Sequence, residues 1–159
     1  MKPVVRRLNP IELNTEQIRL LNTFGNITHA TGKDVIIEER FDRIIFIVAS
    51  GEMGLAIGDQ GVKIKKLSSV LHKSVEVVEL IEDPVLFIRK MLGSNLSDEQ
   101  INVAIDDFKR IKIIVDASKK GSVIGREGRH AEKARLLGKK YFDIQRITID
   151  TPEGSELKW

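Results

Sequence analysis

The pattern of apolar positions in the first half of the chain predicts two helices and three strands. The first helix is expected to begin after Asn14, which forms the pattern of a capping box with Gln17, and to end at Gly32. Two β-branched runs with a polar break between them predict a hairpin, and a second helix and a third strand follow. The expected ranges are a helix over 15–30, strands over 35–39 and 44–49, a short helical turn over 55–57, a helix over 62–71 and a strand over 75–80.

The second half of the chain repeats this order from the hairpin onward, after a short helix that Pro84 opens and Gly93 closes. Apolar residues then alternate with polar ones as in half-buried strands, and a strongly basic helix precedes the last strand. The expected ranges are a helix over 85–92, strands over 101–105 and 111–115, a helix from about 129 to 140 and a strand over 142–149. Pro152 and Gly154 indicate a flexible tail over 151–159.

An internal repeat explains this similarity, because shifting the sequence by 67 residues aligns the two halves without a gap. The aligned pairs are Ile44 with Ile111, Ile47 with Ile114, Val48 with Val115, Gly54 with Gly121, Ile57 with Ile124, Gly58 with Gly125 and Gly61 with Gly128. We therefore expect two small domains over 1–82 and 83–150, followed by the tail.

The composition excludes several classes of protein. The chain has 159 residues, of which 42% are hydrophobic and 31% charged, as in an ordinary globular protein. It contains no cysteine, which excludes disulfides, zinc fingers, iron–sulfur clusters and thiol nucleophiles. The longest apolar run, 44–49, is too short to cross a bilayer, and no signal peptide opens the chain. We expect a cytoplasmic protein that has no contact with a membrane.

The charge is unevenly distributed, although the net value is only +3. Residues 118–140 contain eight basic and two acidic side chains, a balance of +6. Residues 74–107 contain two basic and eight acidic side chains, a balance of −6. This asymmetry predicts one surface for a polyanion and another that faces solvent or a basic partner.

The repeated motif with the clearest chemistry is Ile-Gly-x-x-Gly, which occurs at 57–61 and again at 124–128. Glycines permit positive φ angles and close approach of a ligand to the backbone. The free N–H groups at the start of the helix that follows point toward that ligand, and the helix dipole favours an anion. The motif therefore predicts a site for phosphate groups, with lysines and arginines of the following helices supplying positive charge.

On these residues the sequence resembles the prokaryotic-type KH domain, whose Gly-x-x-Gly loop clamps about four single-stranded nucleotides. With the segments 51–58 before the first loop and 83–88 at the join, the chain is similar to the archaeal NusA-type transcription termination factors over residues 14–149. The resemblance implies an α+β fold of two tandem type II KH domains, each a three-stranded sheet with helices packed on one face. It also implies single-stranded RNA binding in termination or antitermination, RNA polymerase as a protein partner, and no cofactor.

The residues that we expect to contact RNA are the two loops and the basic side chains that follow them. They are Gly58, Asp59, Gln60, Gly61, Lys63, Lys65, Lys66, Gly125, Arg126, Glu127, Gly128, Arg129 and Lys133. Asp59 places a carboxylate at the first phosphate site and repels phosphate by about 1 kcal/mol. The second loop has Arg126 and a more basic helix, so we expect it to bind RNA more strongly.

The sequence offers no catalytic or metal-binding constellation. Its three histidines have no partner residues nearby, and neither glycine loop continues as a Walker motif. With only eight aromatic residues, the chain also lacks the stacking platforms of RRM domains and oligonucleotide-binding barrels. We expect a monomer that is not an enzyme. The alternative that stays open is a protein-interaction module with little RNA affinity that docks on RNA polymerase or a ribosomal assembly through the acidic stretch 74–107.

Overall fold

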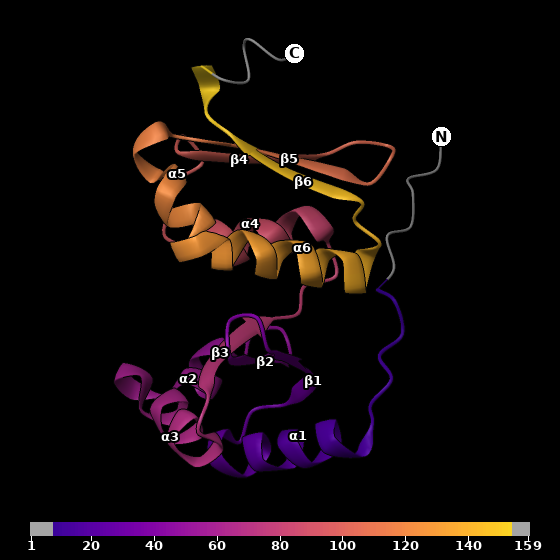
Figure 1. Cartoon of the computed structure of the whole chain (residues 1–159), viewed down its shortest axis with the longest axis vertical. Coiled ribbons are helices and arrows are strands. Elements are labelled where there is room, and N and C mark those ends of the chain that lie inside the picture. Colours follow the sequence, from indigo (N-terminus) through magenta and orange to yellow (C-terminus); the bar gives the residue numbers. More distant parts are fainter. Residues whose placement is uncertain (1–7, 154–159) are drawn as a thin grey trace. The chain divides into compact units, whose positions relative to one another are not determined.

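The computed structural model describes residues 8–153, which form two compact units, and each is described by itself (Figure 1). The first unit comprises residues 11–81, and the second comprises 82–153 together with 8–10. The elements of the first unit are α1 (Thr15–Thr28), β1 (Gly32–Glu38), β2 (Arg43–Val48), α2 (Met53–Ile57), the 3₁₀ turn η1 (Asp59–Gly61), α3 (Val62–Leu71) and β3 (Ser74–Glu79). The elements of the second unit are α4 (Pro84–Gly93), β4 (Ile101–Ile105), β5 (Arg110–Val115), α5 (Ala117–Ile124), the 3₁₀ turn η2 (Arg126–Gly128), α6 (Arg129–Phe142) and β6 (Arg146–Asp150).

The two units contain sheets of the same topology, which confirms the α+β class. In the first unit β2 pairs antiparallel with β1 and parallel with β3, and in the second unit β5 pairs antiparallel with β4 and parallel with β6. The strand that follows the glycine loop and its helix is therefore an edge strand in each sheet. An edge strand leaves one row of backbone N–H and C=O groups unpaired within the sheet.

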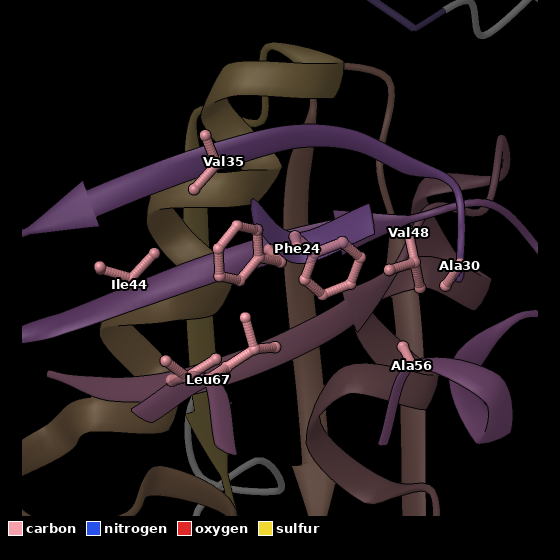
Figure 2. Packing of buried hydrophobic residues seen from close by; sticks show 9 residues of the cluster. Phe24, Ala30, Val35, Ile44, Val48, Ala56 and Leu67 are labelled. Carbon is pink, nitrogen blue, oxygen red and sulfur yellow. The ribbon is translucent and has the colours of Figure 1, made fainter. Parts of the chain in front are cut away.

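The core of the first unit lies between its sheet and its helices (Figure 2). The Phe24 ring of α1 stacks on the Phe46 ring of β2 with 4.4 Å between the ring centroids. Alternate residues of β2 point into this layer because successive side chains of a strand face opposite sides of the sheet. The buried members of the cluster are Phe24, Ala30, Val35, Ile44, Phe46, Val48, Ala56, Leu67 and Val75.

Helix α1 begins as predicted and ends earlier than predicted. The capping box is confirmed, since the Asn14 side chain accepts from the backbone N–H of Gln17 and the Gln17 side chain accepts from that of Asn14. The helix ends at Thr28, and His29 takes the left-handed conformation there, with φ 62°. Gly32 instead opens β1. A Cβ at Gly32 would lie 2.7 Å from Leu21 Cδ2 and 3.2 Å from Phe24 Cδ2, so glycine lets α1 pack closely on the start of β1.

The second unit is built around Phe87 of α4, which contacts two aromatic rings at the end of α6. Its ring centroid lies 6.1 Å from that of Tyr141 and 5.5 Å from that of Phe142. The prediction that a strand begins at residue 142 is therefore wrong. Phe142 is the last residue of α6, Asp143 caps the helix with φ 58°, and the strand begins at Arg146.

The described N-terminal residues contact the second unit, although the sequence predicted a first domain over 1–82. The Asn9 backbone N–H donates to Tyr141 O over 2.9 Å, and its side-chain amide donates to Lys140 O and to Asp143 Oδ1. These bonds satisfy carbonyl groups at the end of α6. Of the expected tail 151–159, residues 152 and 153 are helical, and residues 154–159 lie outside the described part of the chain.

Candidate nucleic-acid interface

The two Gly-x-x-Gly loops have the same backbone conformation. The first glycines, Gly58 and Gly125, have φ/ψ of 76°/173° and 82°/167°. The third residues, Gln60 and Glu127, have 55°/27° and 57°/22°. The final glycines, Gly61 and Gly128, have 74°/19° and 79°/17°. The sequence repeat is therefore a repeat of loop geometry, independent of the side chains that the loops carry.

The two glycines of each motif are required for different reasons. The first glycine has a φ/ψ combination that is essentially restricted to glycine. A Cβ there would also lie 2.7 Å from Lys63 Cγ at Gly58, and 2.4 Å from His130 Cδ2 at Gly125. The final glycine has left-handed helical angles, and a Cβ at Gly61 or Gly128 would meet nothing within 4 Å. The backbone at the final glycine is therefore open to an approaching ligand.

Each loop leads directly into a helix N-terminus, which is the feature that favours an anion. Gly61 is the N-cap of α3 and Gly128 is the N-cap of α6. Glycine has no side chain that could accept hydrogen bonds from the backbone N–H groups of the first turn. These N–H groups, together with the helix dipole, favour the binding of a phosphate.

The three lysines after the first loop have different environments. Lys65 and Lys66 are exposed. Lys63 is half-buried, and its ammonium donates to Thr28 O over 2.7 Å and to Leu55 O over 2.9 Å. These carbonyls belong to the ends of α1 and α2, whose last turns leave C=O groups without helical partners. Lys63 therefore positions the loop, and its contact with RNA stays a prediction.

We expect Lys63→Met to lower the free energy of unfolding by about 1.5–3 kcal/mol, because it removes two hydrogen bonds from a charged donor. The matched variant Lys66→Met should change the free energy of unfolding by less than about 0.5 kcal/mol, because Lys66 is exposed. Urea unfolding followed by circular dichroism measures both values. Equal effects would contradict the positioning role of Lys63.

The second loop carries Arg126 where the first loop carries Asp59. Arg126 and Glu127 are exposed, and Arg129 is half-buried at the start of α6. Lys133 is only 8% exposed, and with His130 it lines a small cavity of about 220 Å³ between α6, α5 and the end of α4. The sequence predicted Lys133 as an RNA contact, but most of its side chain lies inside the second unit, and its contact with RNA stays a prediction.

A larger cleft lies between α6 and the edge strand β6, with a volume of about 660 Å³. Its lining combines cations with aliphatic side chains, which suits a phosphate backbone and flat bases. The residues are Arg135, Lys139, Ile144, Gln145, Arg146, Ile147, Thr148, Ile149 and Asp150. The spacing of Arg135 and Lys139 on one helical face was a visible signal in the sequence. Arg146 was not, because the strand was expected to begin four residues earlier.

Two positions that flank the first loop carry exposed apolar side chains, and the equivalent positions of the second loop carry polar ones. Leu55 is 45% exposed and Val62 is 57% exposed, one on each side of the loop. The corresponding residues 67 positions later are Ser122 and Arg129. The two loops share a backbone conformation and present different chemistry.

Within residues 8–153, the structure brings together no group of three or more His, Asp or Glu side chains that could hold a metal ion. No helix in this range is both long and apolar enough to cross a membrane.

Comparison with known proteins places part of the first unit in a described family. The family model described as the KH domain matches residues 22–82, which include the first loop, α3 and β3. A solved chain, the crystal structure of APE1850, superimposes with a TM-score of 0.73 at 33% sequence identity, covering 86% of this chain and 99% of that one.

Curated relatives from archaea match most of the chain. The probable transcription termination protein NusA of Halococcus morrhuae is 30% identical over 145 residues, which span 87% of this chain and 98% of the relative. The protein of the same name from Halobacterium salinarum is 32% identical over 139 residues, with the same coverage. That of Methanocaldococcus jannaschii is 28% identical over 141 residues and 75% of its length. None of these three is named as an enzyme.

Proposed function

Since this chain belongs to the archaeal family of NusA-type transcription termination proteins and contains a KH domain, we propose that it binds single-stranded RNA through two tandem KH domains. An RNA-binding role in transcription termination follows from the family. The proposal adds that the second unit is a second KH domain, that both Gly-x-x-Gly loops clamp the RNA backbone, and that the protein acts by binding and not by catalysis.

The observation that carries this proposal is the equality of the two loop conformations. Gly61 lies inside the segment that matches the KH family, and Gly128 has φ and ψ within 5° of it. Both glycines begin a helix and both leave open space in front of the backbone. The same physical site for a phosphate is therefore available twice.

The second loop is proposed as the stronger clamp. Arg126 stands where the first loop has Asp59, so the phosphate meets attraction at one site and repulsion at the other. The cleft between α6 and β6 continues the second site with Arg135 and Lys139. If both loops hold one strand, the second contact becomes intramolecular and raises the overall affinity by about 10²–10⁴.

A second candidate function is a protein contact at the first loop. Leu55 and Val62 expose apolar surface there, next to the carboxylate of Asp59. Interfaces between proteins favour such a combination of an apolar centre and a charged rim. RNA polymerase is the proposed protein partner, on the strength of the family's role in transcription termination.

A salt titration tests the RNA-binding proposal. Log affinity for a single-stranded 12-nucleotide RNA should fall linearly with log salt, with a slope of about −3 for four neutralised phosphates and about −6 for eight. Fluorescence anisotropy between 50 and 300 mM salt measures this slope. If the chain shows no binding at low salt, RNA clamping is wrong and the protein-contact function is favoured.

A further inference from the structure

Phe108 is the one exposed aromatic side chain among residues 8–153. It is 71% exposed at the tip of the β4–β5 hairpin. The other described aromatic rings are buried or half-buried. Aromatic rings contribute most of their stabilising free energy when they are buried, so this ring contributes little to folding and is accessible to a ligand.

The hairpin tip that carries Phe108 is held rigidly. Asp106 Oδ1 accepts from the backbone N–H groups of Phe108 and Arg110 over 2.9 and 3.0 Å, and Asp106 Oδ2 accepts from Arg110 Nε over 2.7 Å. The hydrogen bond from the Arg110 backbone is the main reason that the pKa of Asp106 lies below its ordinary value. Lys109 O accepts from Gln145 N over 2.7 Å, which ties the tip to the segment before β6. The ring is therefore presented on a fixed support.

The equivalent hairpin of the first unit shows the same pair of residues in a covered state. Phe41 and Arg43 stand 67 positions before Phe108 and Arg110. The guanidinium of Arg43 lies 4.8 Å from the Phe41 ring centroid, and its side chain is 0% exposed. The guanidinium of Arg110 lies 5.1 Å from the Phe108 ring centroid, and its side chain is 54% exposed. The second unit thus leaves both members of this aromatic–arginine pair exposed, whereas in the first unit Arg43 is buried and Phe41 is half-buried.

Arg110 of this pair also lines a second cleft, of about 570 Å³. Arg110 and Lys112 of this lining alternate along β5 with the buried Ile111 and Ile113, so the cleft lies on the face of the sheet opposite the core. Arg110 and Arg146 are direct neighbours across β5 and β6, and both are exposed. Like charges directly opposite each other in a sheet are destabilising. A phosphate bound between the two guanidinium groups would offset that repulsion. Each guanidinium can donate two parallel hydrogen bonds to phosphate oxygens.

This second cleft shares part of its lining with the cleft between α6 and β6. Arg146, Thr148 and Asp150 line both of them, because they lie on the edge strand β6 that separates the two. A strand of RNA in the first cleft can therefore reach the second by passing around the edge of the sheet. The hairpin tip lies at the opposite end of this sheet from α5 (Figure 1), so the contact extends the binding surface away from the glycine loop.

We propose that one nucleotide of the bound RNA passes around β6, stacks its base on Phe108 and places its phosphate between Arg110 and Arg146. This inference rests on the proposed RNA-binding function. A nucleotide combines one anionic group with a flat aromatic face, as the site requires. An acidic peptide supplies the anionic group but lacks the flat aromatic face that would stack on the exposed Phe108 ring.

The test uses the full chain and a fluorescein-labelled pool of random 12-nucleotide single-stranded RNA. Phe108→Leu keeps an apolar side chain and removes the aromatic face, and we expect it to weaken binding about tenfold, as is usual for loss of one stacked base. Phe108→Trp should restore the affinity of the original protein or exceed it. Both variants should fold normally, since the ring is exposed, and thermal unfolding verifies this.

Leu86→Ala is the matched control, because Leu86 is also an exposed apolar residue of the second unit. It should leave RNA affinity unchanged. If the original chain binds RNA and Phe108→Leu binds equally well, the stacking proposal is wrong and the proposed function stands. If the original chain binds no RNA, the proposed function itself fails. If a 12-residue polyglutamate peptide binds in a Phe108-dependent manner and RNA does not, the site belongs to an acidic protein partner and the proposal is overturned.

Discussion

Replacing Gly128 by aspartate is expected to lower the affinity for single-stranded RNA by about ten- to a hundredfold. A Cβ at Gly128 meets nothing within 4 Å, so the new carboxylate would occupy the space from which a phosphate approaches the start of α6. Two like charges about 4 Å apart repel by about 1 kcal/mol in water and about 4 kcal/mol near a protein surface. The left-handed angles at this position cost a non-glycine residue only about 1 kcal/mol of stability, and aspartate is among the residues that tolerate them best.

Gly128→Asn is the control. Asparagine has nearly the same shape as aspartate and tolerates the left-handed backbone angles equally well, but it carries no charge. Its RNA affinity should fall much less than that of Gly128→Asp. The first glycine is a poor position for this experiment, because any side chain at Gly125 collides with His130 and changes the loop itself. Binding of the random 12-nucleotide RNA, measured by fluorescence anisotropy, gives the comparison.

Gly61→Asp in the first loop tests the ranking of the two loops. Because Asp59 already places a carboxylate at that site, a further one should have a smaller effect than at Gly128. Equal losses of affinity at Gly61 and Gly128 would show that both loops contribute alike and would contradict the ranking.

Replacing Arg43 by methionine is expected to lower the free energy of unfolding by about 3–5 kcal/mol, which is the usual cost of removing one partner from a buried ion pair. The Arg43 side chain is fully buried at the start of β2, where it hydrogen-bonds to the carboxylates of Glu38 and Glu76 and packs on the Phe41 ring. Methionine fills much of the same volume and leaves both carboxylates without their cation. Urea unfolding followed by circular dichroism measures the loss.

The repeat supplies the matched control for this variant. Arg110 stands at the equivalent position of the second unit, but its side chain is largely exposed and its ion pair with Asp106 is solvated. Arg110→Met should therefore cost only about 0–1 kcal/mol. The triple variant Glu38→Gln, Arg43→Met, Glu76→Gln should recover part of the loss, because it also removes the two carboxylate charges that Arg43 bonds. If Arg43→Met lowers the free energy of unfolding no more than Arg110→Met does, burial does not determine how much the Arg43 ion pairs stabilise the protein.

Most elements of the fold were predictable because their signals are local. The capping box at Asn14, the proline that opens α4 and the apolar alternation of the strands all act within a few residues. The structure differs from the expectation at Gly32 and at Phe142, where packing overrides the local pattern. Gly32 packs closely against Leu21 and Phe24, and Phe142 remains helical where it packs on Phe87. The chain before Pro10 also differs, because Asn9 bonds to the end of α6.

The candidate site divides in the same way. The positions of the glycine loops, their approximate charge and the helices that follow them were visible in the sequence. The different environments of Lys63 and Lys66 were not, since adjacent stretches of basic residues look alike until the carbonyls of Thr28 and Leu55 are found next to one ammonium group. The clefts on either side of β6 also required the pairing of strands.

The sequence by itself determined the repeat, the positions of the two Gly-x-x-Gly loops and the family, because glycine spacing and hydrophobic periodicity can be read from neighbouring residues in the chain. Only the tertiary structure decided which lysine donates hydrogen bonds to backbone carbonyls, which arginine is buried and which aromatic ring is exposed. Those outcomes depend on contacts between residues far apart in the chain. Phe41 and Phe108 show the difference most clearly, since the repeat makes them equivalent and the structure leaves one half-buried and the other exposed.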